Sequence, residues 1–190
     1  MLKLSFVFFG LFLSFTIQAI TISNVDIAET VSHSDQSTKL ILNGAGIRSK
    51  FIFDIYIGSL YLEKKAHTPD DIYKLHGEKR VSMHFLYKEV EKEKLIAGWN
   101  EGFKNNHDSA TFEKLKSRLS RFNNLFSTVK KGDVINLNFI PTTGTSVVIN
   151  NKTIGLIEGD DFFTALLKVW LGDEPADSNL KEAMLGLKNN

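Results

Sequence analysis

The sequence predicts an α+β protein built from one antiparallel sheet and separate groups of helices. Its 190 residues suit a single domain, and 43% of them are hydrophobic, an ordinary value for a globular chain. Segments with strand-like composition occupy the first half of the chain and return near its end, and a block with helical spacing separates them. This grouping indicates an α+β fold, because a parallel α/β fold alternates strands and helices.

The strands are expected in segments rich in β-branched and aromatic residues, several of which alternate apolar with polar positions. Turn residues in "TTG" and "NNK" divide the last of these segments into three short strands. The segments are Ile20–Val31, Thr38–Gly44, Phe51–Leu62, Arg80–Tyr87 and Asp133–Glu158.

The helices are indicated by capping residues and by apolar residues three or four positions apart. A short helix begins with Thr68 as its cap and Pro69 at its first position, and Gly77 is expected to end it. The other helical segments are Glu89–Asn105, Phe112–Phe126, Gly159–Gly172 and Asp177–Gly186.

Residues 1–19 are typical of a secretory signal peptide. A basic residue, Lys3, precedes the uncharged apolar run Leu4–Ile17, and the small residue Ala19 marks the expected cleavage site. The apolar run is shorter than the ~20 residues of a membrane-spanning helix, which favours cleavage over anchoring. We therefore expect a signal peptide over residues 1–19, one mature domain over residues 20–190, no membrane span after cleavage, and a bacterial periplasmic location.

The net charge bears on the kinds of binding partner, and the cysteine content bears on how the fold is stabilised. The chain has 23 Lys and Arg residues against 22 Asp and Glu residues, and removal of residues 1–19 takes away one lysine and no acid. The resulting net charge near zero argues against nucleic acid or an anionic membrane surface as the main partner. The sequence contains no cysteine, so this exported domain must rely on its core rather than on disulfides.

Common cofactor, metal and nucleophile motifs do not fit the residues present. The stretch "NGAGIRS" begins like a dinucleotide-binding loop, but Ser49 stands where the third glycine should be. The five histidines lack the paired spacing of metal ligands, and no cysteine can act as a nucleophile. We therefore expect neither a cofactor nor a metal.

Arg48 and Tyr56 are the candidate ligand-binding residues. In an extended strand, Tyr56 lies on the opposite face from the expected core residues. These core residues are Phe51, Phe53, Ile55 and Ile57. Arginine binds a carboxylate through two parallel hydrogen bonds, and a buried phenol can donate a third. The alternative is an exposed Arg48 and a Tyr56 that is half buried in ordinary packing.

The spacing between these two residues requires a turn. On one continuous strand, Arg48 and Tyr56 would lie ~26 Å apart. The intervening "SKFIF" contains none of the residues that favour turns most strongly, glycine, proline and asparagine. Spacing alone therefore does not bring the two side chains together.

Four stretches, in this order, resemble the chalcone isomerase-like superfamily, specifically its bacterial exported branch. They are "LNGAGIRSK", "DIYIGSLYLEKKA", "FIPTTGTSVVINNKTIG" and "LGDEPADSNLKEAMLG". The resemblance covers roughly Leu40 to Leu187. It implies a large antiparallel sheet packed against a layer of helices, an open-faced sandwich with a ligand cleft between the layers. The superfamily contains plant enzymes that close chalcones to flavanones and related proteins that bind fatty acids without catalysis.

The resemblance also implies roles for particular positions. The family's key arginine falls on Arg48. Tyr56 stands where the isomerases carry a catalytic threonine and where the fatty-acid-binding branch carries a tyrosine. A catalytic tyrosine of the isomerases falls approximately on Phe112, which has no hydroxyl, and a further polar position falls on Val169.

These departures favour binding over catalysis. The expected function is binding of a fatty-acid-like amphipathic carboxylate in an apolar cleft through Arg48 and Tyr56. One alternative is an isomerase or intramolecular lyase that acts on a phenolic enone, with Arg48 stabilising the enolate. The other is a periplasmic scaffold that binds a protein partner and whose cleft is filled by Phe85, Trp99 and Phe122. Trp99 and Trp170 are expected to fill the core rather than to line the cleft.

Overall fold

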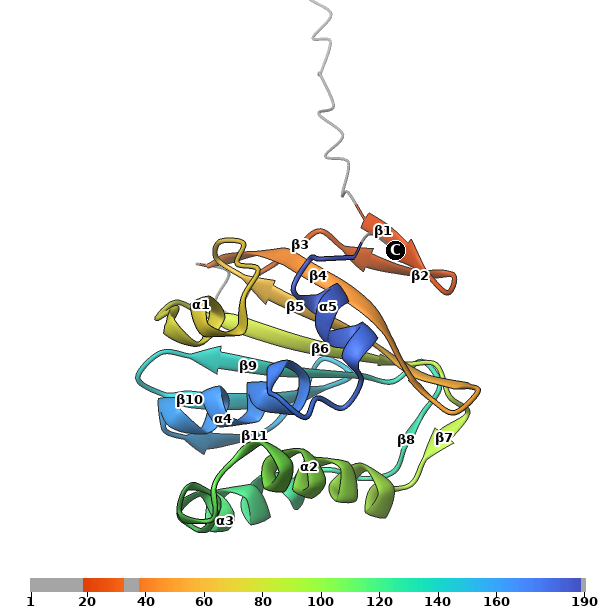
Figure 1. Ribbon diagram of the computed structural model, residues 1–190. Helices are drawn as coiled ribbons and strands as arrows, with labels where there is room; N and C mark the ends of the chain where they lie inside the picture. Colours follow the sequence, from red (N-terminus) through yellow and green to blue (C-terminus); the bar gives the residue numbers. More distant parts are fainter. Residues whose placement is uncertain (1–18, 33–37, 189–190) are drawn as a thin grey trace, which may run out of the picture.

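The computed structural model describes residues 19–32 and 38–188. Its largest sheet contains β3 (Thr30–Ser32), β4 (Lys39–Lys50), β5 (Phe53–Leu62), β6 (Lys79–Phe85), β9 (Val134–Ile140), β10 (Gly144–Ile149) and β11 (Lys152–Glu158). These seven strands are antiparallel and follow the order β11-β10-β9-β6-β5-β4-β3 (Figure 1). The predicted α+β class is confirmed.

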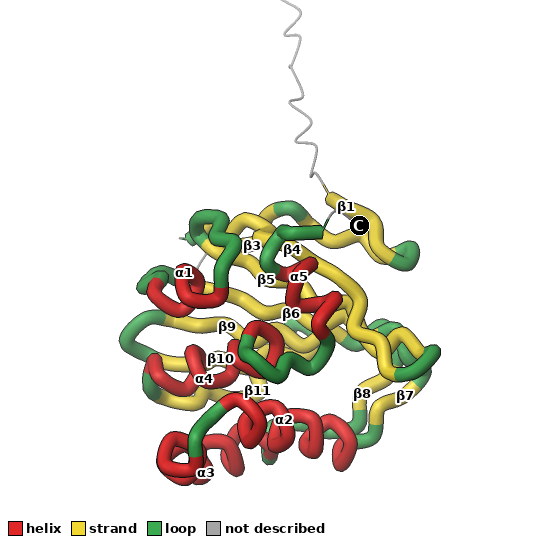
Figure 2. The backbone as a smooth tube through the Cα atoms, viewed as in Figure 1, coloured by secondary structure: helices red, strands yellow, loops and turns green. Residues whose placement is uncertain are grey.

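Helices cover one face of this sheet. They are α1 (Pro69–Lys74), α2 (Lys92–Asn106), α3 (Ser109–Asn123), α4 (Asp160–Leu171) and α5 (Ser178–Met184). Each buries apolar residues in one cluster with alternate residues of the strands, such as Val81 and Leu137. Figure 2 shows α2 and α3 side by side, and α3 contacts the β11 edge of the sheet. The largest core therefore lies between the sheet and the helices.

The other face is covered only at one end. There the hairpin of β1 (Ala19–Ile22) and β2 (Val25–Ala28) buries Ile22 and Ile27 in a smaller cluster against β4 and β5. A two-stranded ribbon of β7 (Glu89–Val90) and β8 (Val129–Lys130) lies on the side of the molecule toward which β4 and β5 extend (Figure 1). The sheet is thus a sandwich that is closed by helices on one face and mostly open on the other.

Three expectations about the strands were wrong. The strand expected over Thr38–Gly44 does not end at Gly44, because β4 continues to Lys50. The segment Ile20–Val31 is not one strand, because Ser23 and Asn24 adopt φ angles of 47° and 60° and turn the chain between β1 and β2. The face of β5 that was expected to be core is only partly so: Ile57 is buried in the smaller cluster under the β1–β2 hairpin, but Phe51 and Phe53 are exposed. Tyr56, which was expected on the opposite face, belongs to the larger core beneath the helices.

The first helix ends earlier than expected. Thr68 caps α1 as predicted, since its side chain accepts a hydrogen bond from the Asp71 amide at 3.2 Å. The helix stops at Lys74, with Leu75 in an extended conformation, rather than at Gly77.

The expected signal peptide lies outside the described residues except for Ala19, so its cleavage stays a prediction. Within the described parts of the chain, no helix is long and apolar enough to cross a membrane.

Candidate functional site

The β4–β5 hairpin brings Arg48 and Tyr56 together. The chain turns at Phe51 and Ile52, and Arg48 and Tyr56 are direct partners in the antiparallel register. Phe51 takes a φ angle of 57°, in the left-handed region that bulky residues rarely adopt. The turn was missed in the sequence because its residues are phenylalanine and isoleucine rather than glycine or asparagine.

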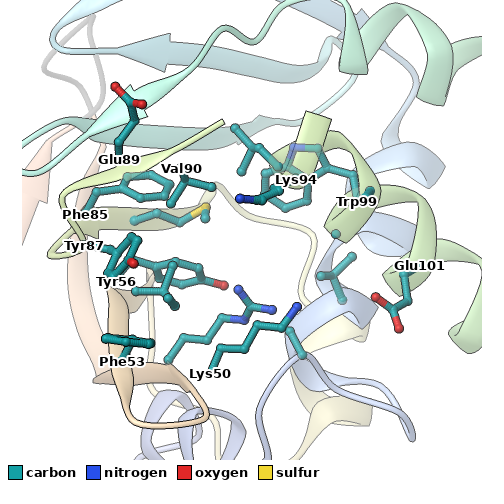
Figure 3. A pocket seen from close by; sticks show the side chains of 18 of the residues that line it. Lys50, Phe53, Tyr56, Phe85, Tyr87, Glu89, Val90, Lys94, Trp99 and Glu101 are labelled. Carbon is teal, nitrogen blue, oxygen red and sulfur yellow. The ribbon is translucent and has the colours of Figure 1, made fainter. Parts of the chain in front are cut away.

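A partly open cavity of about 370 Å³ lies beside this hairpin, between the sheet and α2. Its volume is within the range of small-molecule sites. Apolar residues make up much of the wall: Ile55, Met83, Phe85, Val90, Leu95, Trp99 and Val169. Arg48 and Tyr56 line the same cavity. Figure 3 shows Tyr56 and Phe85 on one side of this space and Trp99 on another.

Arg48 has an incomplete set of hydrogen bonds. Its Nε atom is buried and has no hydrogen-bond partner within the described residues. Its guanidinium carbon lies 5.6 Å from the centre of the Tyr56 ring, a cation–π distance. An unpaired buried donor is costly, so a ligand oxygen that accepted from this guanidinium would remove an energetic penalty from the folded protein.

Tyr56 is held in one orientation by a second aromatic residue. The indole Nε1 of Trp170 donates a hydrogen bond to the Tyr56 hydroxyl at 2.9 Å, and both side chains are buried. Burial raises the pKa of the Tyr56 hydroxyl, while Arg48 and the Trp170 hydrogen bond offset part of this increase. The hydroxyl therefore keeps its proton at neutral pH, and Trp170 already occupies one of its acceptor positions. Its remaining capacity includes donation to a ligand.

Asp177 is an acidic residue near Tyr56, and beyond the effect of burial its negative charge adds a small increase to the pKa of the Tyr56 hydroxyl. One of its carboxylate oxygens accepts from the Ser49 amide at 3.1 Å, and the other accepts from the Leu180 amide at 3.0 Å as the cap of α5. These bonds hold the carboxylate against backbone amides, and the described residues contain no ion pair between Asp177 and Arg48. The guanidinium of Arg48 therefore has no carboxylate partner within the described residues and can bind the anionic group of a ligand.

The remaining residues singled out in the sequence are divided between cavity and core. Phe85 and Trp99 line the cavity without closing it, and Val169 lines it as well. Phe122 is buried in the core, where its ring lies edge-on to that of Trp99. Phe112 is partly buried against the core and does not line the described cavity. Trp170 fills the core as expected. Trp99 is buried in the same core, as expected, and also forms part of the cavity wall.

Charged residues complete the lining and were not anticipated from the sequence. They are Lys50, Glu89, Lys94 and Glu101 (Figure 3). Lys94 ends the run "KEVEKEK" at residues 88–94, whose alternating charges are typical of a solvated helix face. Together with Arg48, the lining carries three cations and two carboxylates. No cluster of potential metal ligands occurs in the parts of the chain that the structure describes.

The fold has counterparts among known proteins. A family model described as chalcone isomerase-like matches residues 19–186. The chain belongs to the chalcone isomerase-like family. No curated protein matches it at a significant level. A crystal structure of a fatty-acid binding protein from Arabidopsis thaliana matches with a TM-score of 0.67 and 17% identity, over 88% of this chain and 96% of the plant chain. This likeness confirms the chalcone isomerase-like fold that the sequence predicted.

Proposed function

We propose that this chalcone isomerase-like protein binds a fatty-acid-like amphipathic carboxylate without catalysis. The carboxylate would accept hydrogen bonds from Arg48 and from the Tyr56 hydroxyl, and the apolar chain would lie along Met83, Leu95 and Trp99. The observation that carries this proposal is the incompletely hydrogen-bonded Arg48 in the wall of a mainly apolar cavity. The structural likeness to a plant fatty-acid binding protein supports the same ligand class.

The two alternatives have less support. An isomerase that uses an ionised phenol is disfavoured because burial raises the pKa of the Tyr56 hydroxyl, and Phe112 supplies no second phenol. Turnover of a chalcone by the purified protein would reverse this preference. A scaffold with a filled cleft is disfavoured because Phe85 and Trp99 leave about 370 Å³ unfilled beside Arg48.

We also propose that the protein acts in the bacterial periplasm after cleavage following Ala19. The support is the charge and hydropathy pattern of residues 1–19. A mature chain that begins at Ile20 retains the β1–β2 pairs Ile20–Ile27, Thr21–Asp26 and Ile22–Val25. The intact mass of protein isolated from a periplasmic fraction tests this proposal directly.

The ligand proposal is tested by extracting lipids from purified mature protein and identifying them by mass spectrometry. Wild-type protein is expected to carry a fatty acid, and Arg48→Ala is expected to lose it while keeping its circular dichroism spectrum. Arg121→Ala, which removes an exposed arginine of α3, serves as the matched control and is expected to retain the lipid. Absence of a carboxylate ligand from the folded wild-type protein, together with no binding of added palmitate, would reject the proposal.

A further inference from the structure

The tip of the β4–β5 hairpin exposes large apolar side chains. Phe51 is 92% exposed and Ile52 is 88% exposed, more than any other large hydrophobic residue described. Phe53 and Tyr87 extend this apolar surface, and their rings meet edge to face with centres 5.4 Å apart. In Figure 1 the tip projects at the side of the molecule, near the β7–β8 ribbon. The rest of the described chain buries neither Phe51 nor Ile52, so packing within the folded protein does not account for two large apolar side chains at this position.

The exposed tip is continuous with the mouth of the cavity. Phe51, Phe53 and Tyr87 belong to its lining, together with Arg48 on the adjoining part of β4. Whatever covers the tip therefore also covers the entrance to the site. This continuity distinguishes the tip from the exposed apolar residues Ile154 and Leu156, which lie on β11 at the opposite edge of the sheet.

The backbone conformation at Phe51 is unfavourable for a phenylalanine. Phe51 has a φ angle of 57°, a conformation that favours glycine or asparagine. Asparagine at this position would ease the strain and reduce the exposed apolar area at the same time. A strained and fully exposed phenylalanine therefore has no evident structural purpose in the isolated molecule.

The size and charge of this surface fit a lipid bilayer better than a protein partner. Even with the partial exposure of Phe53 and Tyr87 added to Phe51 and Ile52, the surface amounts to roughly 600 Å², below the ~800 Å² per partner of a stable protein interface. A bilayer needs no matching surface, because a narrow apolar tip can enter it directly. Lys50 and Lys88, which adjoin Phe51 and Tyr87, are exposed and form no ion pair within the described residues. Their ammonium groups can contact lipid phosphates while the alkyl chains lie along the apolar region.

We propose that the Phe51–Ile52 tip inserts into the surface of a phospholipid bilayer and places the mouth of the cavity against the lipid. Apolar insertion provides the binding, and the two lysines contact phosphate groups at the rim. The near-zero net charge of the mature chain argues against attraction of the whole protein to an anionic membrane, so the binding has to come from apolar insertion and from the two local lysines. The proposal goes beyond ligand binding and does not depend on whether Arg48 holds a carboxylate.

The test is co-sedimentation of the mature protein with vesicles of phosphatidylethanolamine and phosphatidylglycerol. Ile52→Ser is the primary variant because Ile52 does not line the cavity. It is expected to lower the partition coefficient about tenfold, and Phe51→Asn with Ile52→Ser is expected to lower it further. The double variant Ile154→Ser with Leu156→Ser removes apolar exposure from β11 and is expected to bind vesicles as the wild type does.

The outcomes separate this proposal from the ligand proposal. Arg48→Ala is expected to keep vesicle binding even when it loses its fatty acid. Wild-type protein that does not sediment with vesicles would overturn the insertion proposal, as would equal losses in the tip and β11 variants. A tip variant that dissociates a dimer in light scattering but leaves vesicle binding unchanged would overturn it too and assign the tip to a second copy instead.

Discussion

At the scale of single residues, the hydrogen bond between Trp170 and Tyr56 fixes the orientation of the Tyr56 hydroxyl in the cavity wall. The bond lies in the core, and it joins α4 to β5. The tilted packing of Phe85 against the Tyr56 ring, with centres 5.6 Å apart, further restricts the phenol. Tyr56 is therefore both a structural residue and a candidate ligand donor, and the two roles can be separated by mutation.

We predict that Tyr56→Phe lowers the free energy of unfolding by about 1–3 kcal/mol, because it leaves the buried Trp170 N–H without an acceptor. Denaturant unfolding of Tyr56→Phe, Trp170→Phe and the double variant forms a complete cycle. The double variant should lose clearly less stability than the sum of the two single losses. Tyr87→Phe, on the exposed rim, should change stability by less than about 0.5 kcal/mol. Additive effects of the two core substitutions would show that the bond contributes nothing to stability.

The sequence was informative about single residues where local chemistry decides their role. Thr68 was recognised as a helix cap because its neighbours Pro69, Asp70 and Asp71 form a typical first turn. The proximity of Arg48 to Tyr56 was not evident from spacing, because it depends on a turn that places Phe51 in a left-handed conformation. The larger core lies on the Tyr56 side of β5 because the helices cover that face of the sheet. The sequence of a single strand does not show which of its faces the helices will cover.

At the scale of elements, the attachment of α5 to β4 depends on two consecutive residues. The buried amide of Asn43 donates to the carbonyls of Ala66 and Met184, both at 2.8 Å, and accepts from the Ala66 amide at 2.9 Å. A Cβ atom on the next residue, Gly44, would lie 2.0 Å from the carbonyl oxygen of Ala183. The "NG" at the start of "NGAGIRS" thus lets the backbones of β4 and α5 meet, which is a structural role rather than a phosphate-binding one.

We predict that Gly44→Ala destabilises the protein by several kcal/mol, because its methyl group would overlap backbone atoms that cannot rotate away. Gly98→Ala is the matched control, since Gly98 lies within α2 and a methyl group added there would point into open space. That variant should stabilise the protein by about 0.5–1 kcal/mol through helix propensity. Thermal unfolding measures both changes. Equal stabilities for the two variants would contradict the close approach of α5 and β4.

Element types were predictable where the apolar pattern is long, as in β5 and α4, and element boundaries were less so. Ser23 and Asn24 form the turn of the β1–β2 hairpin, so the one strand expected over Ile20–Val31 overlooked the turn preference of Asn24. The pair Glu89–Val90 was expected to begin a helix, but it forms β7 by pairing with Val129 and Lys130. Such two-residue strands depend on a distant partner, and local composition does not indicate them.

At the scale of the whole molecule, the cavity joins parts of the chain that are far apart in sequence. Its lining comes from β4 to β7, from α2 and α4, and from Ala176 before α5. A ligand that fills this space therefore contacts both layers of the sandwich. Since the sequence contains no cysteine, these contacts would add to a fold that has no disulfide to stabilise it.

We predict that palmitate raises the unfolding temperature of the ligand-free protein. A ligand that binds only the folded state at a free concentration about 100 times its dissociation constant adds about 2.7 kcal/mol to the free energy of unfolding. For a domain of this size, that corresponds to a shift of roughly 5–10 °C. Arg48→Ala should lose most of the shift, and Arg121→Ala should retain it. An equal shift in all three proteins would show that palmitate binds through its apolar chain alone and that Arg48 does not hold its carboxylate.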